Sequence, residues 1–191
     1  MKFISTRGGA AVTGAQAIVR GLSPEGGLFV PENFPAVTGA EMEEMLSMSY
    51  PERAARILLK YLDDYDGDEL LSACEKAYAK FDGDPAPLVR IDEGVYMLEL
   101  WHGPTCAFKD MALTLLPYLL RKGCDICGIK EEILILVATS GDTGKAALEG
   151  FKDADGIKIT VFYPSEGVSK MQKLQMCTQD GSNVNVVAVK G

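Results

Sequence analysis

The segment 131-EEILILVATSGDTGKAALEGF-151 predicts a strand, a turn of small and polar residues, and then a helix, the repeating pattern of an α/β sheet protein. The turn is not a phosphate-binding P-loop, which needs G-x-x-x-x-G-K-S/T. Thr139 stands where that motif has its first glycine, and Ala146 stands where it has its magnesium-binding hydroxyl. The free N–H groups at the start of the helix still favour an anionic group. Alternatively, Ser140 or Asp142 caps an ordinary helix.

The chain around this stretch alternates between strands and helices. Strands are predicted at 95–100, 132–138, 157–164 and 184–189, and helices at 108–123, 142–152 and 169–178. Because the strands are apolar nearly throughout, we expect a parallel sheet that helices cover on both faces. Ligands bind beyond the carboxyl ends of such strands, which is where we place the loops 101–107 and 139–143. Pro117 is expected to kink or shorten its helix.

The N-terminal part of the chain has a different pattern. A short strand is predicted at 2–5, and helices are predicted at 40–49, 51–65 and 68–81. The turn-rich stretch 82-DGDPAP-87 marks a boundary. We therefore expect an α/β protein in which a small N-terminal α/β domain, residues 1–87, precedes part of a helix-covered parallel-sheet domain, residues 88–191.

Composition excludes several classes of partner. The 191 residues are 47% hydrophobic, which suffices for a core, and no apolar run approaches the ~20 residues of a membrane helix. The N-terminal sequence lacks the apolar segment of a signal peptide. A net charge of −8 argues against nucleic acid or an anionic membrane as a partner. We expect a cytoplasmic protein.

The cysteines do not indicate a metal site. Their number, 5, is odd, and the chain has no export signal, which suits a reducing compartment. Cys124 and Cys127 form one CxxC pair, and His102 is the single histidine. A zinc site needs about four ligands. We therefore expect small buried or loop thiols and no bound metal.

Lys109 is a candidate for covalent chemistry. It is predicted to begin a helix directly after the loop 103-GPTCAFK-109. Since a cation is disfavoured at a helix N-terminus, this placement would supply a neutral amine that attacks a carbonyl. A Schiff base with an aldehyde cofactor is the natural use of such a lysine. The alternative is a solvated lysine paired with Asp110 or another acid.

Two segments together, 102-HGPTCAFKDMALTLLPYLL-120 and 138-ATSGDTGKAALEGF-151, closely resemble the threonine synthase family. These are pyridoxal-phosphate enzymes of the fold that also contains the tryptophan synthase beta subunit and cysteine synthase. The segments 4-ISTRG-8, 21-GLSPEGGLFVP-31 and 167-GVSKMQKLQMCT-178 resemble the same family in the same order. The resemblance covers essentially the whole chain. It implies a threonine-synthase-type N-terminal domain followed by a partial pyridoxal-phosphate-binding catalytic domain.

The resemblance implies roles for individual residues. Lys109 matches the lysine that forms the Schiff base with the cofactor, and His102 and Thr105 line its loop, where they would orient cofactor or substrate. Asp142 stands beside the cofactor's ring hydroxyl, where most relatives on the wider fold carry asparagine. The loop that matches the receptor for the substrate carboxylate comprises Thr139, Ser140, Gly141, Asp142 and Thr143.

The implied reaction converts O-phospho-L-homoserine and water to L-threonine and phosphate, with Lys109 moving protons. Arg7 and Lys170 are candidates for binding the substrate phosphate. Two alternatives stay open. One is another pyridoxal-phosphate enzyme of this fold, a dehydratase or a β-replacement enzyme, and the other is a non-catalytic scaffold fragment.

One feature of the resembled family is missing from the sequence. The glycine-rich loop that binds the cofactor phosphate lies beyond the SGDTG segment in the family, but the glycines after Gly167 are only Gly181 and Gly191. The residue that meets the pyridine nitrogen is absent for the same reason. We therefore expect the chain to stop partway through the catalytic domain and to be inactive alone. An exposed sheet edge would favour self-association.

Overall fold

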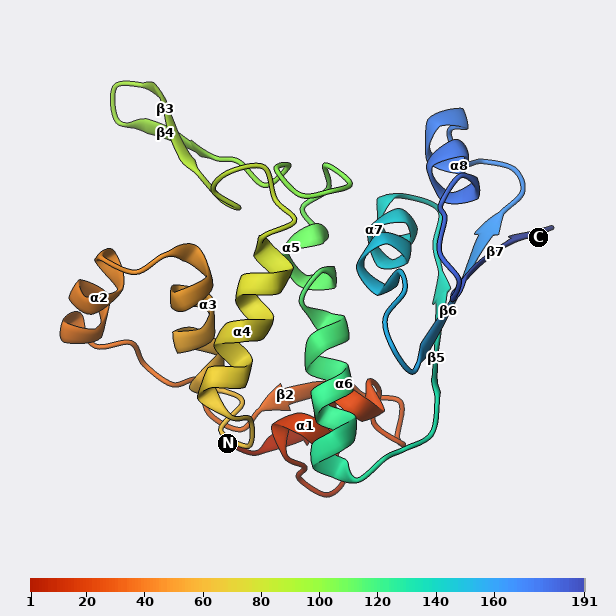
Figure 1. Ribbon diagram of the computed structural model, residues 1–191. Helices are drawn as coiled ribbons and strands as arrows, with labels where there is room; N and C mark the ends of the chain where they lie inside the picture. Colours follow the sequence, from red (N-terminus) through yellow and green to blue (C-terminus); the bar gives the residue numbers. More distant parts are fainter. Residues whose placement is uncertain (191) are drawn as a thin grey trace. The chain divides into compact units, whose positions relative to one another are not determined.

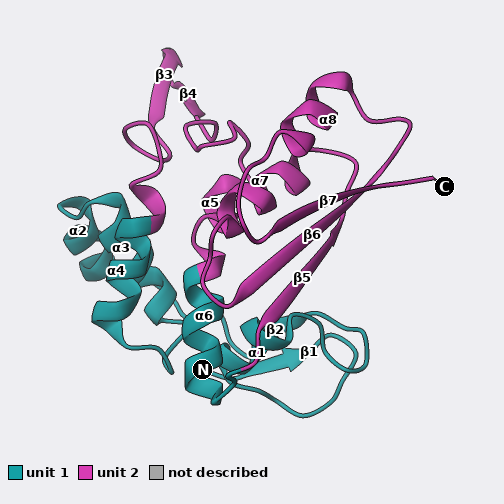
Figure 2. Cartoon of the chain, turned by 45° about the vertical axis from the view of Figure 1, so that its right-hand side comes forward, with its two compact units in different colours: residues 1–76, 118–130 teal, residues 77–117, 131–191 magenta. Residues whose placement is uncertain are grey.

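The structure is a computed structural model that describes residues 1–190 (Figure 1). The chain folds into two compact units, each made from two segments (Figure 2). Unit 1 comprises Met1–Lys76 and Tyr118–Lys130, and unit 2 comprises Ala77–Pro117 and the chain from Glu131 onward. Both units contain helices and strands, which confirms the predicted α/β class. The predicted boundary between an N-terminal domain and a catalytic domain at residue 87 stays a prediction.

Unit 1 combines a short antiparallel sheet with helices from both of its segments. In the sheet, Phe3 lies opposite Pro31 and Ser5 lies opposite Phe29. The strand predicted at 2–5 and the three helices predicted after it are confirmed, although each helix begins one residue earlier and ends before its predicted last residue. The elements are β1 (Phe3–Ser5), α1 (Gly14–Arg20), β2 (Phe29–Pro31), α2 (Gly39–Leu46), α3 (Tyr50–Leu59), α4 (Gly67–Tyr78) and α6 (Leu116–Cys127).

The first three helices start where the sequence provides capping boxes. In each box the N-cap hydroxyl accepts a hydrogen bond from the backbone N–H three residues later, and the side chain of that residue accepts from the N-cap N–H. The pairs are Thr13 with Gln16, Thr38 with Glu41, and Ser49 with Glu52. Pro51 stands in the first turn of α3, as expected for a residue without an N–H.

Helix α3 ends at Leu59, earlier than the predicted end at residue 65. The chain then turns, so that the carboxylate of Asp64 accepts a hydrogen bond from the N–H of Ala15 at 2.8 Å. That N–H lies in the first turn of α1, where it has no partner within its own helix. A helix that continued to residue 65 would forgo this bond, so tertiary structure overrides the helical pattern.

The core of unit 1 joins its two segments at Tyr65. The Tyr65 hydroxyl donates a hydrogen bond to the Leu119 carbonyl at 2.8 Å, and its ring is buried. Burial raises the pKa of Tyr65 well above its usual value, so the hydroxyl stays protonated and remains a donor. A Cβ on Gly123 would come within 2.8 Å of this hydroxyl. Helix α6 therefore approaches Tyr65 closely because position 123 is glycine.

Replacing Tyr65 by phenylalanine is expected to lower the free energy of unfolding by about 1 kcal/mol, the usual net contribution of one such hydrogen bond. The ring stays in place, so packing is retained. Urea denaturation followed by circular dichroism measures the change. Tyr61→Phe is the matched control, because the Tyr61 hydroxyl makes no hydrogen bond within residues 1–190. Equal midpoints for both variants would contradict this role.

Unit 2 begins with an antiparallel hairpin formed by β3 (Leu88–Asp92) and β4 (Val95–Leu98). The strand predicted at 95–100 is therefore real, but its expected place in the parallel sheet is wrong. Gly94 has a φ of 70°, which suits the tight turn that pairs β4 with the segment just before it. Both strands are exposed throughout, so β3 had no buried pattern from which to predict it.

The parallel sheet of unit 2 contains three strands in the order β5-β6-β7. Its strand bounds confirm the predictions at 132–138, 157–164 and 184–189, and the two helices that follow β5 and β6 confirm the predictions at 142–152 and 169–178. These elements are β5 (Ile133–Ala138), α7 (Asp142–Phe151), β6 (Ile157–Pro164), α8 (Lys170–Cys177) and β7 (Val184–Val189).

Helices cover one face of this sheet. Helix α7 packs on β5 and β6, and α8 packs on α7. Ile159 and Val161 on the covered face are fully buried. The expectation of two covered faces is wrong for residues 1–190, because the opposite face is exposed. Its large apolar side chains and their exposed fractions are Leu134 at 57%, Leu136 at 63%, Val187 at 40% and Val189 at 45%.

The single helix predicted at 108–123 is divided into α5 (Asp110–Leu113) and α6. Between them the Thr114 hydroxyl donates to the Asp110 carbonyl at 2.7 Å. Pro117 stands in the first turn of α6, where its missing N–H costs nothing, so the expected disruption near Pro117 is confirmed. Helix α5 packs against α7, and a Cβ on Gly150 would lie 2.1 Å from the Leu113 carbonyl oxygen.

Candidate functional site

The loop before Lys109 is held at its N-terminal end by contacts of His102. The Asp82 N–H donates to the His102 carbonyl at 2.9 Å. His102 Nε2 lies 2.7 Å from a carboxylate oxygen of Glu99, and the imidazole stacks on Trp101. These contacts hold the ring of His102 at the entry to the loop. Its role toward a cofactor or substrate stays a prediction.

Thr105 is held inside the loop by Asp110. The Thr105 hydroxyl donates to one carboxylate oxygen of Asp110 at 2.6 Å, and the Thr105 N–H donates to the other at 2.8 Å. Asp110 is 1% exposed and Thr105 is half-buried, so these bonds are partly shielded from solvent. From the sequence, Asp110 was expected only as a possible partner of Lys109. In the structure its carboxylate instead closes the loop on itself.

Lys109 is the N-cap residue of α5. Its Nζ atom lies 4.1 Å from the centroid of the Phe108 ring, a cation–π distance. Within residues 1–190, Lys109 forms no ion pair, so the alternative of a lysine paired with Asp110 or another acid does not hold there. The amine is accordingly available for a ligand.

The loop 139–143 follows β5 at the carboxyl end of the parallel sheet, as expected. The Thr139 N–H still donates to the Phe162 carbonyl of β6 at 3.0 Å, and the Thr139 hydroxyl accepts from the Gly141 N–H at 3.2 Å. Gly141 is the N-cap residue of α7, and no side chain caps this helix. The alternative of an ordinary cap by Ser140 or Asp142 is therefore wrong.

Asp142 is engaged by a residue that sequence reasoning missed. The side-chain amide of Gln172 donates to Asp142 at 3.0 Å, while the Gln172 amide oxygen accepts from the Ser169 hydroxyl at 3.1 Å. Gln172 lies in the quoted stretch 167–178, three residues after the N-cap Ser169. The spacing of Ser169 and Gln172 is the sequence signal for a contact at the start of α8. It cannot reveal Asp142 as a partner of Gln172, because Asp142 and Gln172 lie 30 positions apart.

The two predicted loops lie at the same end of unit 2. Helix α5 packs against α7, and Figure 1 shows both helices entered from that end, one from the loop 101–109 and the other from the loop 139–141. The amine of Lys109 and the uncapped start of α7 thus belong to one region. Such a start leaves backbone N–H groups that attract an anion.

These residues fit part of a pyridoxal phosphate molecule with an amino-acid substrate. The unpaired amine of Lys109 suits the cofactor aldehyde, and the uncapped start of α7 suits a carboxylate. The phosphate group lacks a glycine-rich cradle within residues 1–190. Gly181, the one described glycine beyond Gly167, packs against Lys152 and Val184, and a Cβ there would lie 3.2 Å from either side chain.

The two candidates for the substrate phosphate lie in different units. Arg7, in unit 1, donates to the Glu25 carbonyl at 3.5 Å. Lys170, in unit 2, is the first residue of α8. Their roles stay predictions.

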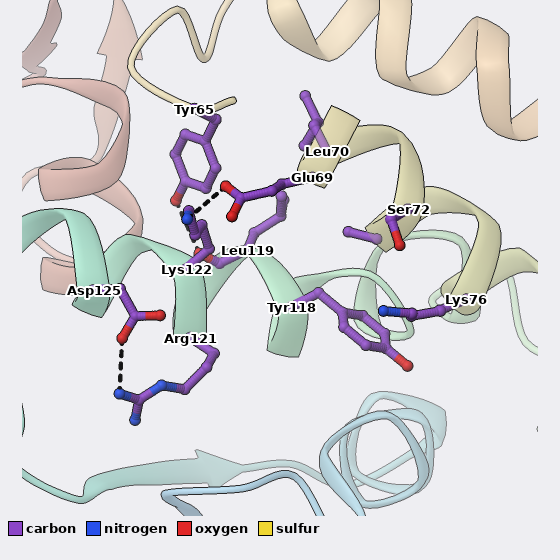
Figure 3. Close-up of a pocket in the computed structure, with 11 residues that line it drawn as sticks. Tyr65, Glu69, Leu70, Ser72, Lys76, Tyr118, Leu119, Arg121, Lys122 and Asp125 are labelled. Carbon is purple, nitrogen blue, oxygen red and sulfur yellow. Dashed lines mark hydrogen bonds and ion pairs between the residues drawn. The ribbon is translucent and has the colours of Figure 1, made fainter. Parts of the chain in front are cut away.

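Unit 1 has a hollow of its own, of about 250 Å³, between α4 and α6 (Figure 3). Lys122 lies 2.5 Å from Glu69, whose hydrogen bond raises the pKa of the lysine, and Arg121 lies 2.9 Å from Asp125. The cations at this hollow are largely matched by acids. None of the residues predicted to bind cofactor or substrate lines it, so it is separate from the candidate site.

All five cysteines are free thiols. Cys74 and Cys124 are buried, whereas Cys106 and Cys177 are exposed. Burial raises the pKa of Cys74 to about 11 and also raises that of Cys124. Within residues 1–190 no group of three or more His, Cys, Asp or Glu side chains is placed to hold a metal ion.

Iodoacetamide at pH 8 should therefore alkylate Cys106 and Cys177 well before Cys74. The thiolate is the reactive form, and a pKa of about 11 leaves Cys74 almost entirely protonated at that pH. Together with burial, this should slow Cys74 by roughly a hundredfold or more. Peptide mass spectrometry over time measures each rate, and guanidinium-unfolded protein is the control. Rapid alkylation of Cys74 in the folded chain would contradict its burial.

Within residues 1–190, every helix is too short or too polar to span a bilayer.

Known proteins are similar to this chain in sequence and in fold. Residues 2–78 match the family model described as threonine synthase N terminus. The Pseudomonas aeruginosa threonine synthase is 39% identical over 194 residues, an alignment that covers 100% of this chain and 41% of that protein. The PLP-bound threonine synthase structure from Brucella melitensis superposes with a TM-score of 0.91 at 35% identity, over 100% of this chain and 41% of that one. The yeast threonine synthase structure gives 0.90 at 31% identity, over 100% and 40%. The chain thus spans about two-fifths of the length of these relatives.

Proposed function

We propose, on the premise that this chain corresponds to the N-terminal portion of threonine synthases, that it supplies the lysine and the substrate-carboxylate loop of a pyridoxal-phosphate-dependent threonine synthase. Residues 1–87 would form the N-terminal domain and residues 88–191 part of the catalytic domain, in a cytoplasmic enzyme. The observation that carries the proposal is the unpaired amine of Lys109 at the start of α5, which packs beside the uncapped helix α7.

In this proposal the reaction converts O-phospho-L-homoserine and water to L-threonine and phosphate. The bound cofactor supplies an electron sink for the substrate carbons. The backbone N–H groups and hydroxyls of residues 139–143 hold the substrate carboxylate. Nζ of Lys109 would hold the cofactor aldehyde, and at the substrate it would take protons and return them. Phosphate leaves from the γ carbon, and water adds at the β carbon.

A chimera tests the proposal. Residues 1–191 would replace the aligned two-fifths of the Pseudomonas aeruginosa threonine synthase, and the unmodified enzyme would be the control. We expect the chimera to form threonine and phosphate in equal amounts from O-phospho-L-homoserine. A folded chimera that retains cofactor but forms neither product would overturn the proposal. Keto-acid formation from serine or threonine alone would instead favour the dehydratase alternative.

Asp142→Ala in the chimera should leave the fold intact, shift the absorbance of bound cofactor and lower turnover about tenfold, since one polar contact is worth about 1 kcal/mol or more. The control is Asp142→Asn, which keeps an acceptor for Gln172 and is expected to stay closer to the unmodified chimera. Absorbance spectra and steady-state rates measure both effects. If neither changed in the alanine variant, Asp142 would have no role at the cofactor.

A further inference from the structure

Asp110 is the one acidic side chain buried within residues 1–190, with 1% of its surface exposed. A buried carboxylate is costly unless hydrogen bonds replace its water. Both oxygens of Asp110 are satisfied by a single residue, Thr105, through its N–H at 2.8 Å and its hydroxyl at 2.6 Å. Within residues 1–190 the carboxylate has no cation as a partner. Its position is therefore set by the loop and not by an ion pair.

The pair of hydrogen bonds from Thr105 to the carboxylate of Asp110, here called the clasp, leaves no free space on the side of Gly103. A Cβ on Gly103 would lie 2.5 Å from both Cβ and a carboxylate oxygen of Asp110. The carboxylate thus occupies the volume that any larger residue at 103 would need. The two bonds close the segment from Thr105 to Asp110 into a hydrogen-bonded loop, and Gly103 packs against its carboxylate.

The loop closed by the clasp contains one strained residue, and hydrogen bonds of α5 fix its C-terminal end. Cys106 has a φ of 57°, a left-handed conformation that costs a non-glycine residue about 1–2 kcal/mol. Such strain persists only where surrounding contacts fix it. At the base, the buried Thr114 hydroxyl donates to the Asp110 carbonyl at 2.7 Å. The Lys109 carbonyl accepts from the Leu113 N–H at 2.9 Å.

Lys109 lies within the loop closed by the clasp, one residue before Asp110. Its backbone is fixed by the first turn of α5, and its side chain extends over the Phe108 ring. We propose that Asp110 is a positioning residue, whose carboxylate clasps Thr105 and so fixes the direction in which the amine of Lys109 is presented to an aldehyde. This inference rests on the proposed function, and it assigns a task to a residue that the proposed reaction does not itself use.

Reductive trapping on the 191-residue chain tests the clasp without enzymatic activity. Pyridoxal phosphate in millimolar excess is added with sodium cyanoborohydride. The lysine nitrogen bonds to the aldehyde carbon, water leaves, and hydride from the reagent reduces the C=N bond to a stable secondary amine. Peptide mass spectrometry then gives the yield at Lys109 relative to Lys80 and Lys173, which are exposed lysines of the same unit.

We expect Lys109 to be labelled faster than either reference lysine. Asp110→Ala should reduce that ratio by about tenfold, since a misplacement of about 1 Å can cost a hundredfold. Asp110→Asn should keep most of it, because the amide oxygen can accept the Thr105 N–H and the amide NH2 can donate to the Thr105 hydroxyl. Hydrogen exchange at the Thr105 amide should accelerate in the alanine variant only.

Two results overturn the inference. One is an unchanged Lys109 ratio in Asp110→Ala despite faster exchange at Thr105, and the other is an asparagine variant as impaired as the alanine one. If Asp110→Ala does not fold, Thr105→Val removes only the hydroxyl donor and must still lower the ratio. A different result would contradict the proposed function itself: the unmodified chain would show no preference for Lys109 over Lys80 and Lys173.

Discussion

Replacing Lys109 by alanine in the chimera should abolish both the visible absorbance of bound cofactor and nearly all formation of threonine. In the proposed function this residue holds the cofactor aldehyde and then moves protons at the substrate. Proton transfer by a positioned group alone contributes about a hundredfold to ten-thousandfold, so a loss of at least that size is expected. Absorbance spectroscopy and a phosphate-release assay measure the two effects.

The matched control for this prediction is Lys173→Ala, which removes an exposed lysine on α8 that lies outside the proposed site. It should retain the spectrum and the rate. A Lys109→Ala chimera that kept both cofactor absorbance and turnover would contradict the proposed role of Lys109. Loss of absorbance with retained turnover would do the same, because the proposed amine would then be dispensable.

The second large effect is expected of the 191 residues expressed alone: no threonine formation, and little or no pyridoxal phosphate after dialysis. The reason is that residues 1–190 hold no glycine-rich cradle for the cofactor phosphate. Charge-assisted hydrogen bonds to a phosphate contribute roughly 1.5–3 kcal/mol each. The loss of several such bonds weakens binding by several orders of magnitude. Cofactor content is measured by absorbance against protein concentration, and stoichiometric cofactor after dialysis would contradict this account.

The same isolated chain should self-associate. One face of its parallel sheet carries the exposed side chains of Leu134, Leu136, Val187 and Val189. The hairpin adds Leu88 and Tyr96, which are 65% and 55% exposed. Large exposed apolar patches drive association. Sedimentation velocity over a concentration series should show oligomers, and the Leu136→Lys variant should show fewer. A strictly monomeric chain at high concentration would contradict this expectation.

The sequence predicted those parts of the fold whose pattern depends on burial. Strand β6 alternates buried residues with less buried ones and has the predicted bounds, because its covered face packs on α7. Strand β3 was missed because it is exposed on both faces and is defined only by its pairing with β4. Helix α3 ends early for a different reason, since the bond between Asp64 and Ala15 joins positions 49 residues apart.

The candidate site was predictable as a set of loops and not as a set of contacts. The motif around Lys109 and the SGDTG loop mark residues at the starts of α5 and α7, and that placement is local. The contact of Gln172 with Asp142, by contrast, depends on how α8 packs on α7. The clasp of Asp110 on Thr105 spans only five residues. It was missed because a carboxylate beside a lysine first suggests an ion pair.

The discontinuous make-up of unit 1 has a consequence for synthesis on the ribosome. Helix α6 supplies the Leu119 carbonyl to Tyr65 and brings Gly123 against Val19, yet it follows α5, which belongs to unit 2. A nascent chain that has emerged only as far as Lys76 therefore lacks the helix against which Tyr65 packs. Unit 1 can complete its core only after the chain has emerged to about Lys130, by which time the lysine loop of unit 2 is already outside the exit tunnel. Domains usually fold one after another from the N-terminus. Here unit 1 cannot complete its fold until residues 118–130 are made, and these are synthesised after the first segment of unit 2.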